Sequence, residues 1–219
     1  MTEDQLVTED QPVPDWLREL ADAAGKMEIN PLIQPPASGG RASAVLVLFG
    51  TGPGGPGGPD DPDLLFIQRS ADLRLHAGQP AFPGGAIDTA DGGPVAAALR
   101  EAAEEVGVDP DGVDVVGTLP ELFIPRTGFR VVPVLAWWRQ PCAVAPVDPA
   151  EVASVERVSV SELADPATRV MVKGPGGFLS PAFRVKGMLI WGFTAVLVDR
   201  LLALAGWERP WDTAKIIDL

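Results

Sequence analysis

The chain has 219 residues, a formal net charge of −13 at pH 7 and a sequence pI of about 4.4. This acidic balance argues against a nucleic-acid-binding surface, which needs clustered Lys and Arg. A single Cys excludes an internal disulfide, and no apolar run is long enough to span a membrane. The N-terminus carries no signal-peptide pattern, so we expect a soluble, cytoplasmic protein with neither a nucleic-acid nor a membrane partner.

Forty-one residues precede the first predicted strand. Residues 1–12 are polar and acidic, which is typical of a disordered tail. Within residues 13–40 we expect a helix from Trp16 to about Ala24, N-capped by Pro14-Asp15, and then an extended Pro-rich arm.

The segments that follow alternate between strand-like and helical composition. Apolar, β-branched runs predict strands at residues 42–49, 64–68, 115–119 and 129–137. Residues 151–160 mix acidic residues with valine, and residues 161–163 begin a short helix. We expect a longer helix from about Lys186 to Ala205 and a tail at residues 206–219. This order predicts an α/β or α+β fold, in which a mixed sheet has helices on its faces.

A nominal nucleotide-binding motif follows the first strand. Gly50-Thr51-Gly52-Pro53-Gly54-Gly55 matches the dinucleotide fingerprint G-x-G-x-x-G. That fingerprint requires a helix at its end, whereas the next residues, PGGPDDPD, cannot be helical. We therefore interpret residues 50–63 as a flexible loop that joins two strands.

Residues 94–108 predict an acidic helix. Pro94 suits its first turn, Gly107 suits its C-terminus, and the residues between them are mostly strong helix formers. Four apolar side chains form one stripe that should face a core: Val95, Leu99, Ala102 and Val106. Three carboxylates lie on the other side: Glu101, Glu104 and Glu105.

These carboxylates have two interpretations. Like charges at helical spacing repel, and a bound divalent cation would offset the repulsion because hard cations take carboxylate oxygens. The alternative is a solvated acidic face, which is the usual meaning of a charge run. The helix alone favours the solvated face, whereas the surrounding motifs favour the cation site.

The stretch from Phe82 to Val108 resembles the Nudix signature, G-x5-E-x7-R-E-U-x-E-E-x-G-U, where U is aliphatic. The matching residues are Gly85, Arg100, Glu101, Ala102, Glu104, Glu105, Gly107 and Val108. Asp91 stands in place of the first Glu, and one extra residue separates it from Arg100.

The segment upstream resembles a second motif, LLTxRS-x3-R-x3-G-x3-FPGG, found in Nudix coenzyme A diphosphatases. The matching residues are Leu65, Arg69, Ser70, Arg74, Gly78 and Phe82-Pro83-Gly84-Gly85. Phe66 and Ile67 depart from it, whereas the Asp and the insertion are familiar from that subfamily. Gly128-Phe129 and residues 190–195 are also similar to it, so the resemblance extends from about residue 40 to 205.

The resemblance implies a Nudix αβα sandwich that binds Mg²⁺ or Mn²⁺. Glu101 and Glu105 are then the chief metal ligands. Glu104 is a further ligand or the group that takes a proton from the attacking water. A backbone carbonyl of Gly84 or Gly85, positions that would also contact substrate, completes the ligand shell.

The arginines have separate implied roles. Arg100 joins Glu104 as a candidate catalytic residue because bidentate pairing would orient a carboxylate. Arg69 and Arg74 are candidate partners for the 3′-phosphate or the diphosphate of coenzyme A, with pairing to a surface acid as the alternative. We expect Asp91 to stabilise its loop and not to bind metal.

Other polar and aromatic residues receive structural interpretations. Glu151 and Glu156 are rival candidates for a further carboxylate, although we expect both to face solvent. His76 is expected to be an ordinary loop histidine. Of Trp137 and Trp138, one is expected in the core and one at the rim.

The resemblance implies metal-dependent hydrolysis of the diphosphate in coenzyme A or its thioesters, giving 3′,5′-ADP and 4′-phosphopantetheine products. One alternative is a different small-molecule substrate: ADP-ribose, a dinucleoside polyphosphate or a nucleoside triphosphate. The other is a non-catalytic Nudix domain that binds a nucleotide. The Nudix domain is expected at residues 41–205, and the oligomeric state stays open, with a homodimer among the candidates.

Overall fold

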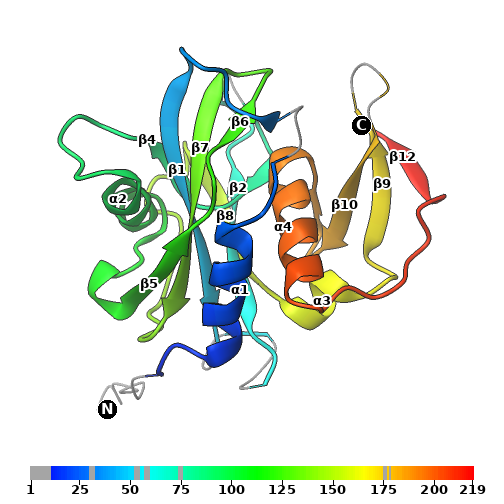
Figure 1. Ribbon diagram of the computed structural model, residues 1–219, viewed down its shortest axis with the longest axis horizontal. Helices are drawn as coiled ribbons and strands as arrows, with labels where there is room; N and C mark the ends of the chain where they lie inside the picture. The colour runs from blue at the N-terminus through cyan, green and yellow to red at the C-terminus, as the bar shows by residue number, and fades with distance from the viewer. Residues whose placement is uncertain are drawn as a thin grey trace.

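The computed structural model describes residues 11–29, 33–51, 55–56, 60–73, 76–174, 177 and 179–219. These residues form two β-sheets and the helices that cover them (Figure 1). Arg74 and residues 1–10 of the expected disordered tail lie outside the described residues.

The main sheet is mixed. Its strands are β1 (Arg41–Gly50), β2 (Asp63–Arg69), β3 (Pro80–Ala81), β4 (Gly84–Ala86), β5 (Val113–Thr118), β6 (Leu122–Ile124), β7 (Phe129–Trp138) and β8 (Val152–Ser159). The central order is β3-β2-β1-β7-β5, with β4 on β1, β6 on β7 and β8 on β2. β1 and β7 are parallel, whereas the other pairs are antiparallel. Among the described residues, the element after β1 is the strand β2, and not the helix that a dinucleotide-binding motif requires.

Helices cover both faces of the main sheet. In Figure 1, α2 (Pro94–Val106) lies on the left face, and α1 (Asp15–Gly25) and α4 (Gly192–Leu204) lie on the right. Alternate β1 side chains serve the two faces, because Leu46 and Leu48 join the cluster under α2 while Val47 and Phe49 join the cluster under α1 and α4. The predicted mixed sheet with helices on its faces is confirmed.

A smaller sheet lies beyond α4. Its order is β11 (Met188–Ile190), β10 (Leu179–Val185), β9 (Arg169–Lys173) and β12 (Ile216–Asp218). Figure 1 shows α4 between the two sheets, and the short helix α3 (Val160–Ala164) leads from β8 to β9. The short 3₁₀ helix η2 (Pro110–Gly112) leads from α2 to β5.

The predicted start of the last helix is wrong. We expected a helix from about Lys186, whereas residues 188–190 form β11 and the helix begins at Gly192. Lys186 and Gly187 both have positive φ, 49° and 75°, so they form a two-residue turn between β10 and β11. Lys is not a residue that usually signals such a turn.

Two smaller expectations also fail. The first helix has Pro14 at its N-cap and no side-chain cap, because Asp15 is already helical and contacts Arg18 instead. Trp137 and Trp138 are both buried, so neither is a rim residue. Adjacent strand residues point to opposite faces, and here both faces are covered by helices.

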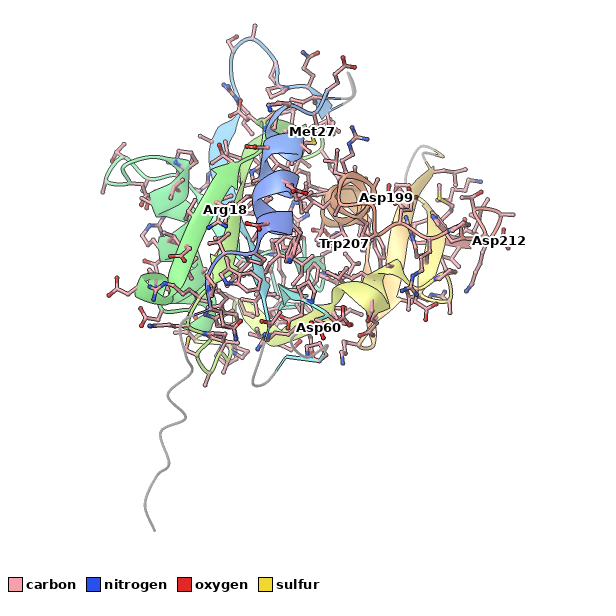
Figure 2. All side chains as sticks on the ribbon, turned by 60° about the horizontal axis from the view of Figure 1, so that its bottom comes forward. Arg18, Met27, Asp60, Asp199, Trp207 and Asp212 are labelled. Carbon is pink, nitrogen blue, oxygen red and sulfur yellow. The ribbon has the colours of Figure 1, made fainter. Side chains whose placement is uncertain are left out.

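An aromatic cluster joins α1 and the segment after α4 to the main sheet. Trp16 of α1 contacts Phe49, Trp137 and Trp207, with ring centroids 5.4, 6.1 and 5.0 Å away. Figure 2 shows α1 and α4 from a second direction, with Trp207 close to both and Asp212 out at the small sheet. Within the part of the chain that the structure describes, none of the helices has the length and apolar character needed to cross a lipid bilayer.

Candidate active site

The candidate site lies where β2 and β4 share one edge of β1. β2 pairs with the end of β1, at Phe49 and Gly50, whereas β4 pairs with its start, at residues 43–45. The Phe82-Pro83-Gly84-Gly85 segment, called the turn below, leads from β3 into β4 and includes the first two residues of β4. Phe82 is buried and stacks on Phe66, with centroids 4.9 Å apart, and the carbonyl of Pro83 accepts from Leu46 N at 2.8 Å. The motif residues therefore anchor the turn against β1.

Two glutamates of α2 meet two glycines of this turn. The Gly84 N–H donates to Glu105 Oε2 at 2.9 Å. The Glu101 carboxylate covers Gly85, where a Cβ would lie 2.5 Å from it, and a Cβ on Gly84 would overlap the Ala44 carbonyl oxygen. Because only glycine leaves this space, the turn holds both carboxylates close to its backbone.

The helix is rotated relative to the predicted stripe. Pro94 stands in its first turn and Gly107 ends it with a φ of 74°, as expected. The buried side chains, however, are Ala97, Ala98, Ala102, Glu105 and Val106, while Val95 and Leu99 are only half-buried. The small alanines allow the helix to approach the sheet closely, and one of the three glutamates is thereby buried.

When no cation is present, the environment of Glu105 makes its carboxyl harder to ionise than that of an ordinary glutamate. Burial raises the pKa of Glu105 to about 7, against the opposing effects of the Gly84 N–H and of Arg69. The nearby charges of Glu101 and Glu151 add to the rise. Burial also raises the pKa of Glu101. A divalent cation would stabilise both ionised carboxylates.

Arg100 holds the carboxylates of this helix in place. Its Nε and Nη2 donate to the two oxygens of Asp91, each at 3.0 Å. Nη1 donates to Glu101 at 3.0 Å and to Glu104 at 2.9 Å, and Nη2 also reaches the Ala86 carbonyl at 3.1 Å. The bidentate partner is thus Asp91, which fixes the guanidinium that orients Glu101 and Glu104.

Asp91 therefore does more than its loop position suggested. Its carboxylate also accepts from Asp88 N at 2.8 Å, so it stabilises the loop as predicted. The hydrogen bonds from Arg100 lower the pKa of Asp91. The alignment with the first Glu of the Nudix signature was the signal in the sequence for this second contact.

Replacing Asp91 with Ala should lower kcat by roughly tenfold, because Arg100 would lose its fixed orientation while Glu101 and Glu105 remain. Asp91→Glu, which keeps the carboxylate, is the matched control and should retain most activity. Steady-state kinetics with both variants test this. A full rate in Asp91→Ala would mean that Asp91 serves only its loop.

Arg69 lies at the end of β2, beside Glu105. The pairing of β2 with β8 shifts register between Gln68 and Arg69, and such irregularities redirect side chains. Arg69 Nη1 lies 3.8 Å from Glu105 Oε1, while its Nε is buried and finds no hydrogen-bond partner among the described residues. Arg69 thus contacts a predicted metal ligand, not a surface acid.

The remaining candidates lie around this core. Glu104 is largely exposed, with 61% of its side chain accessible. Glu151 is exposed and its carbonyl accepts from Ser70 N, whereas Glu156 is half-buried on β8. His76 contacts Gln79 within the loop that leads to β3.

The residues present suit a cation that keeps open positions. Among the described residues, no group of three or more His, Cys, Asp and Glu side chains is placed to hold a metal ion by itself. Mg²⁺ is commonly bound through one or two carboxylates, with waters and substrate phosphates as the other ligands. Glu101 and Glu105 provide such a pair, and the Gly84-Gly85 backbone lies next to them.

The NUDIX domain family model matches residues 41–175, which is more than half of the chain. The chain therefore belongs to the Nudix family.

Two relatives named uncharacterized Nudix hydrolase NudL show the extent of the similarity. The Citrobacter koseri protein is 58% identical over 72 residues, 33% of this chain and only 37% of its own length. The Klebsiella aerogenes protein is 44% identical over 122 residues, 55% of this chain and 95% of its own length. Among solved structures, the Nudix hydrolase RenU from M. Smegmatis is 22% identical with a TM-score of 0.53, over 80% of this chain and 91% of that one. RenU supports the fold alone.

Proposed function

We propose that this chain hydrolyses the diphosphate of coenzyme A or of its thioesters, with Mg²⁺ or Mn²⁺ as cofactor. The observation that carries the proposal is the contact of α2 with the turn, in which Glu101 and Glu105 lie on Gly85 and Gly84 beside Arg69. Cleaving a diphosphate requires positive charge near phosphoryl oxygens and an activated water. This part of the chain supplies residues for both tasks.

The proposed division of labour follows burial and exposure. Glu101 and Glu105 would hold a divalent cation, with the backbone of Gly84 or Gly85 as a further ligand. A bound cation supplies neutralisation of phosphate oxygens and lowers the pKa of its water. Glu104, exposed and oriented by Arg100, would accept the proton of the attacking water or add a ligand. Arg69 would donate to a phosphate oxygen of the substrate.

The coenzyme A assignment depends on the upstream motif. Arg69 precedes a loop that closes on itself, because Gly78 N donates to Ser70 O at 3.1 Å and Arg69 N to Gln79 O at 3.1 Å. Thr194 of α4 lies over the same region, with its hydroxyl 3.3 Å from the Pro80 carbonyl. Two segments that resemble the coenzyme A diphosphatases but are far apart in sequence thus meet beside Arg69.

Metal binding should depend on pH near neutrality. With the pKa of Glu105 at about 7 in the metal-free protein, the cation must displace a proton below this pH. Mn²⁺ affinity should therefore fall by about tenfold per pH unit below the pKa and level off above it. Calorimetry in two buffers of different ionisation enthalpy measures both affinity and proton release. A pH-independent affinity across this range would contradict the assignment of Glu105 as a ligand.

A substrate panel tests the substrate class. If a positively charged site holds the 3′-phosphate, kcat/KM for coenzyme A should exceed that for dephospho-coenzyme A by roughly tenfold or more. Equal values would remove the role of the 3′-phosphate. Faster turnover of ADP-ribose or of a dinucleoside polyphosphate would transfer the proposal to that substrate, and failure to cleave any diphosphate would favour a nucleotide-binding domain.

A further inference from the structure

Arg69 and Glu105 form an ion pair without a hydrogen bond between them. Their nearest atoms, Nη1 and Oε1, are 3.8 Å apart, which exceeds hydrogen-bond distance. Arg69 Nε is buried and has no hydrogen-bond partner among the described residues. Arg69 keeps 28% of its side chain accessible, whereas Glu105 keeps only 8%. A buried donor without an acceptor is costly, and its natural acceptor would be a ligand that enters the site.

The surroundings explain why the pair stays loose. Glu105 Oε2 is already engaged by the Gly84 N–H, and Glu101 and Glu151 place further negative charge around it. The Arg69 backbone is held on both sides, by Gln79 O and by β8. Arg69 therefore places its positive charge beside Glu105 from a fixed backbone, while its buried Nε–H has no acceptor among the described residues.

We propose that Arg69 is an exchangeable counterion: it neutralises Glu105 in the metal-free protein and donates to a substrate phosphate once Glu105 binds a divalent cation. This inference deepens the proposed function and rests on it. Two positive groups cannot both occupy the Oε1 side of Glu105 at low cost. When the carboxylate binds a cation, the guanidinium loses its attraction to Glu105 and its unpartnered Nε becomes available to an anion. Cation and phosphate ligand should then bind cooperatively, through Arg69 as well as through direct contact.

The test measures binding and not turnover. Mn²⁺ affinity and 3′,5′-ADP affinity are determined by calorimetry for the full chain and for Arg69→Gln, Arg69→Lys and Arg130→Gln. Arg130 is the matched control, because it pairs with Glu121 at 2.6 Å, keeps 33% accessibility and lies at the other edge of β1, on β7. Circular dichroism confirms that each variant is folded.

The expected results separate charge from hydrogen bonding. Arg69→Gln removes the competing charge, so Mn²⁺ should bind roughly tenfold more tightly, while 3′,5′-ADP in the presence of Mn²⁺ should bind roughly tenfold more weakly. Arg69→Lys keeps the charge but lacks the Nε donor, so only the affinity for 3′,5′-ADP should fall. Arg130→Gln should change neither affinity.

Two outcomes would overturn the inference. Unchanged or weaker Mn²⁺ binding by Arg69→Gln would show that Arg69 does not compete for Glu105, and unchanged 3′,5′-ADP binding would show that it does not reach phosphate. The proposed function fails separately, if the unmodified chain binds Mn²⁺ and 3′,5′-ADP as predicted but cleaves no diphosphate.

Discussion

Glu105→Gln should lose activity without losing stability. If Glu105 is a metal ligand as proposed, its replacement should lower kcat by roughly 10²–10³-fold, because the charge that would hold the cation in the transition state is gone. Glu101→Gln should show a loss of similar size, since its carboxylate covers the neighbouring glycine of the turn. Steady-state kinetics on coenzyme A with Mg²⁺ measures both effects.

The stability of the metal-free protein provides the control. The pKa of Glu105 in the fold, about 7, is above the value of 4.5 for an ordinary glutamate. The contribution of protonated Glu105 to the free energy of unfolding is therefore complete below pH 4.5 and is lost as the pH rises through about 7. At about pH 8, Glu105→Gln should have a Tm equal to or above that of the unmodified chain, since ionised Glu105 costs on the order of 3 kcal/mol. A large drop in Tm, or near-normal activity with excess metal, would contradict the assigned role.

Alanine at the two glycines of the turn should have different effects: Gly85→Ala should lower activity, and Gly84→Ala should lower stability. At Gly85, the nearest atoms to a Cβ would be those of the Glu101 carboxylate, at the far end of a flexible side chain, so Gly85→Ala should cost little stability but displace that carboxylate. We expect kcat to fall by roughly 10²-fold. At Gly84, where φ is 154°, a Cβ would overlap the Ala44 carbonyl oxygen and lie 2.6 Å from Val45 Cα. Backbone cannot move aside so easily, and Gly84→Ala should destabilise the fold by about 2–4 kcal/mol.

Denaturant unfolding and kinetics together separate these effects. The two substitutions add the same methyl group to adjacent residues, so each serves as the control for the other. If Gly85→Ala were fully active, the Glu101 carboxylate would not need its position over the turn. If Gly84→Ala were as stable as the unmodified chain, the close approach of β4 to β1 would not limit this residue.

Local signals were enough to predict the strands β1, β2, β5 and β7 of the main sheet and the helix α2. Pro94 and Gly107 bound α2 as expected, and the β-branched runs of β1 and β7 form its central parallel pair. The spacing of Glu101, Glu104 and Glu105, together with the motifs around them, indicated where the site lies. These features depend on residues close together in sequence, whose propensities and periodicity agree.

Features set by tertiary contact could not be predicted in the same way. The burial of Glu105 depends on how closely α2 approaches β4, and a helical wheel placed it on the polar side. The strands β3, β4 and β6 have two or three residues each, too few to show a period. The small sheet was missed because its turn at Lys186-Gly187 uses a residue that rarely adopts positive φ.

Product identification tests the proposed activity most directly. The chain is incubated with coenzyme A and Mg²⁺, with Glu105→Gln as the control, and the products are identified by mass spectrometry. We predict equal amounts of 3′,5′-ADP and 4′-phosphopantetheine, both formed roughly 10²–10³-fold more slowly by the variant. Intact coenzyme A after prolonged incubation with Mg²⁺ or Mn²⁺, or cleavage at any bond other than the diphosphate, would contradict the proposed activity.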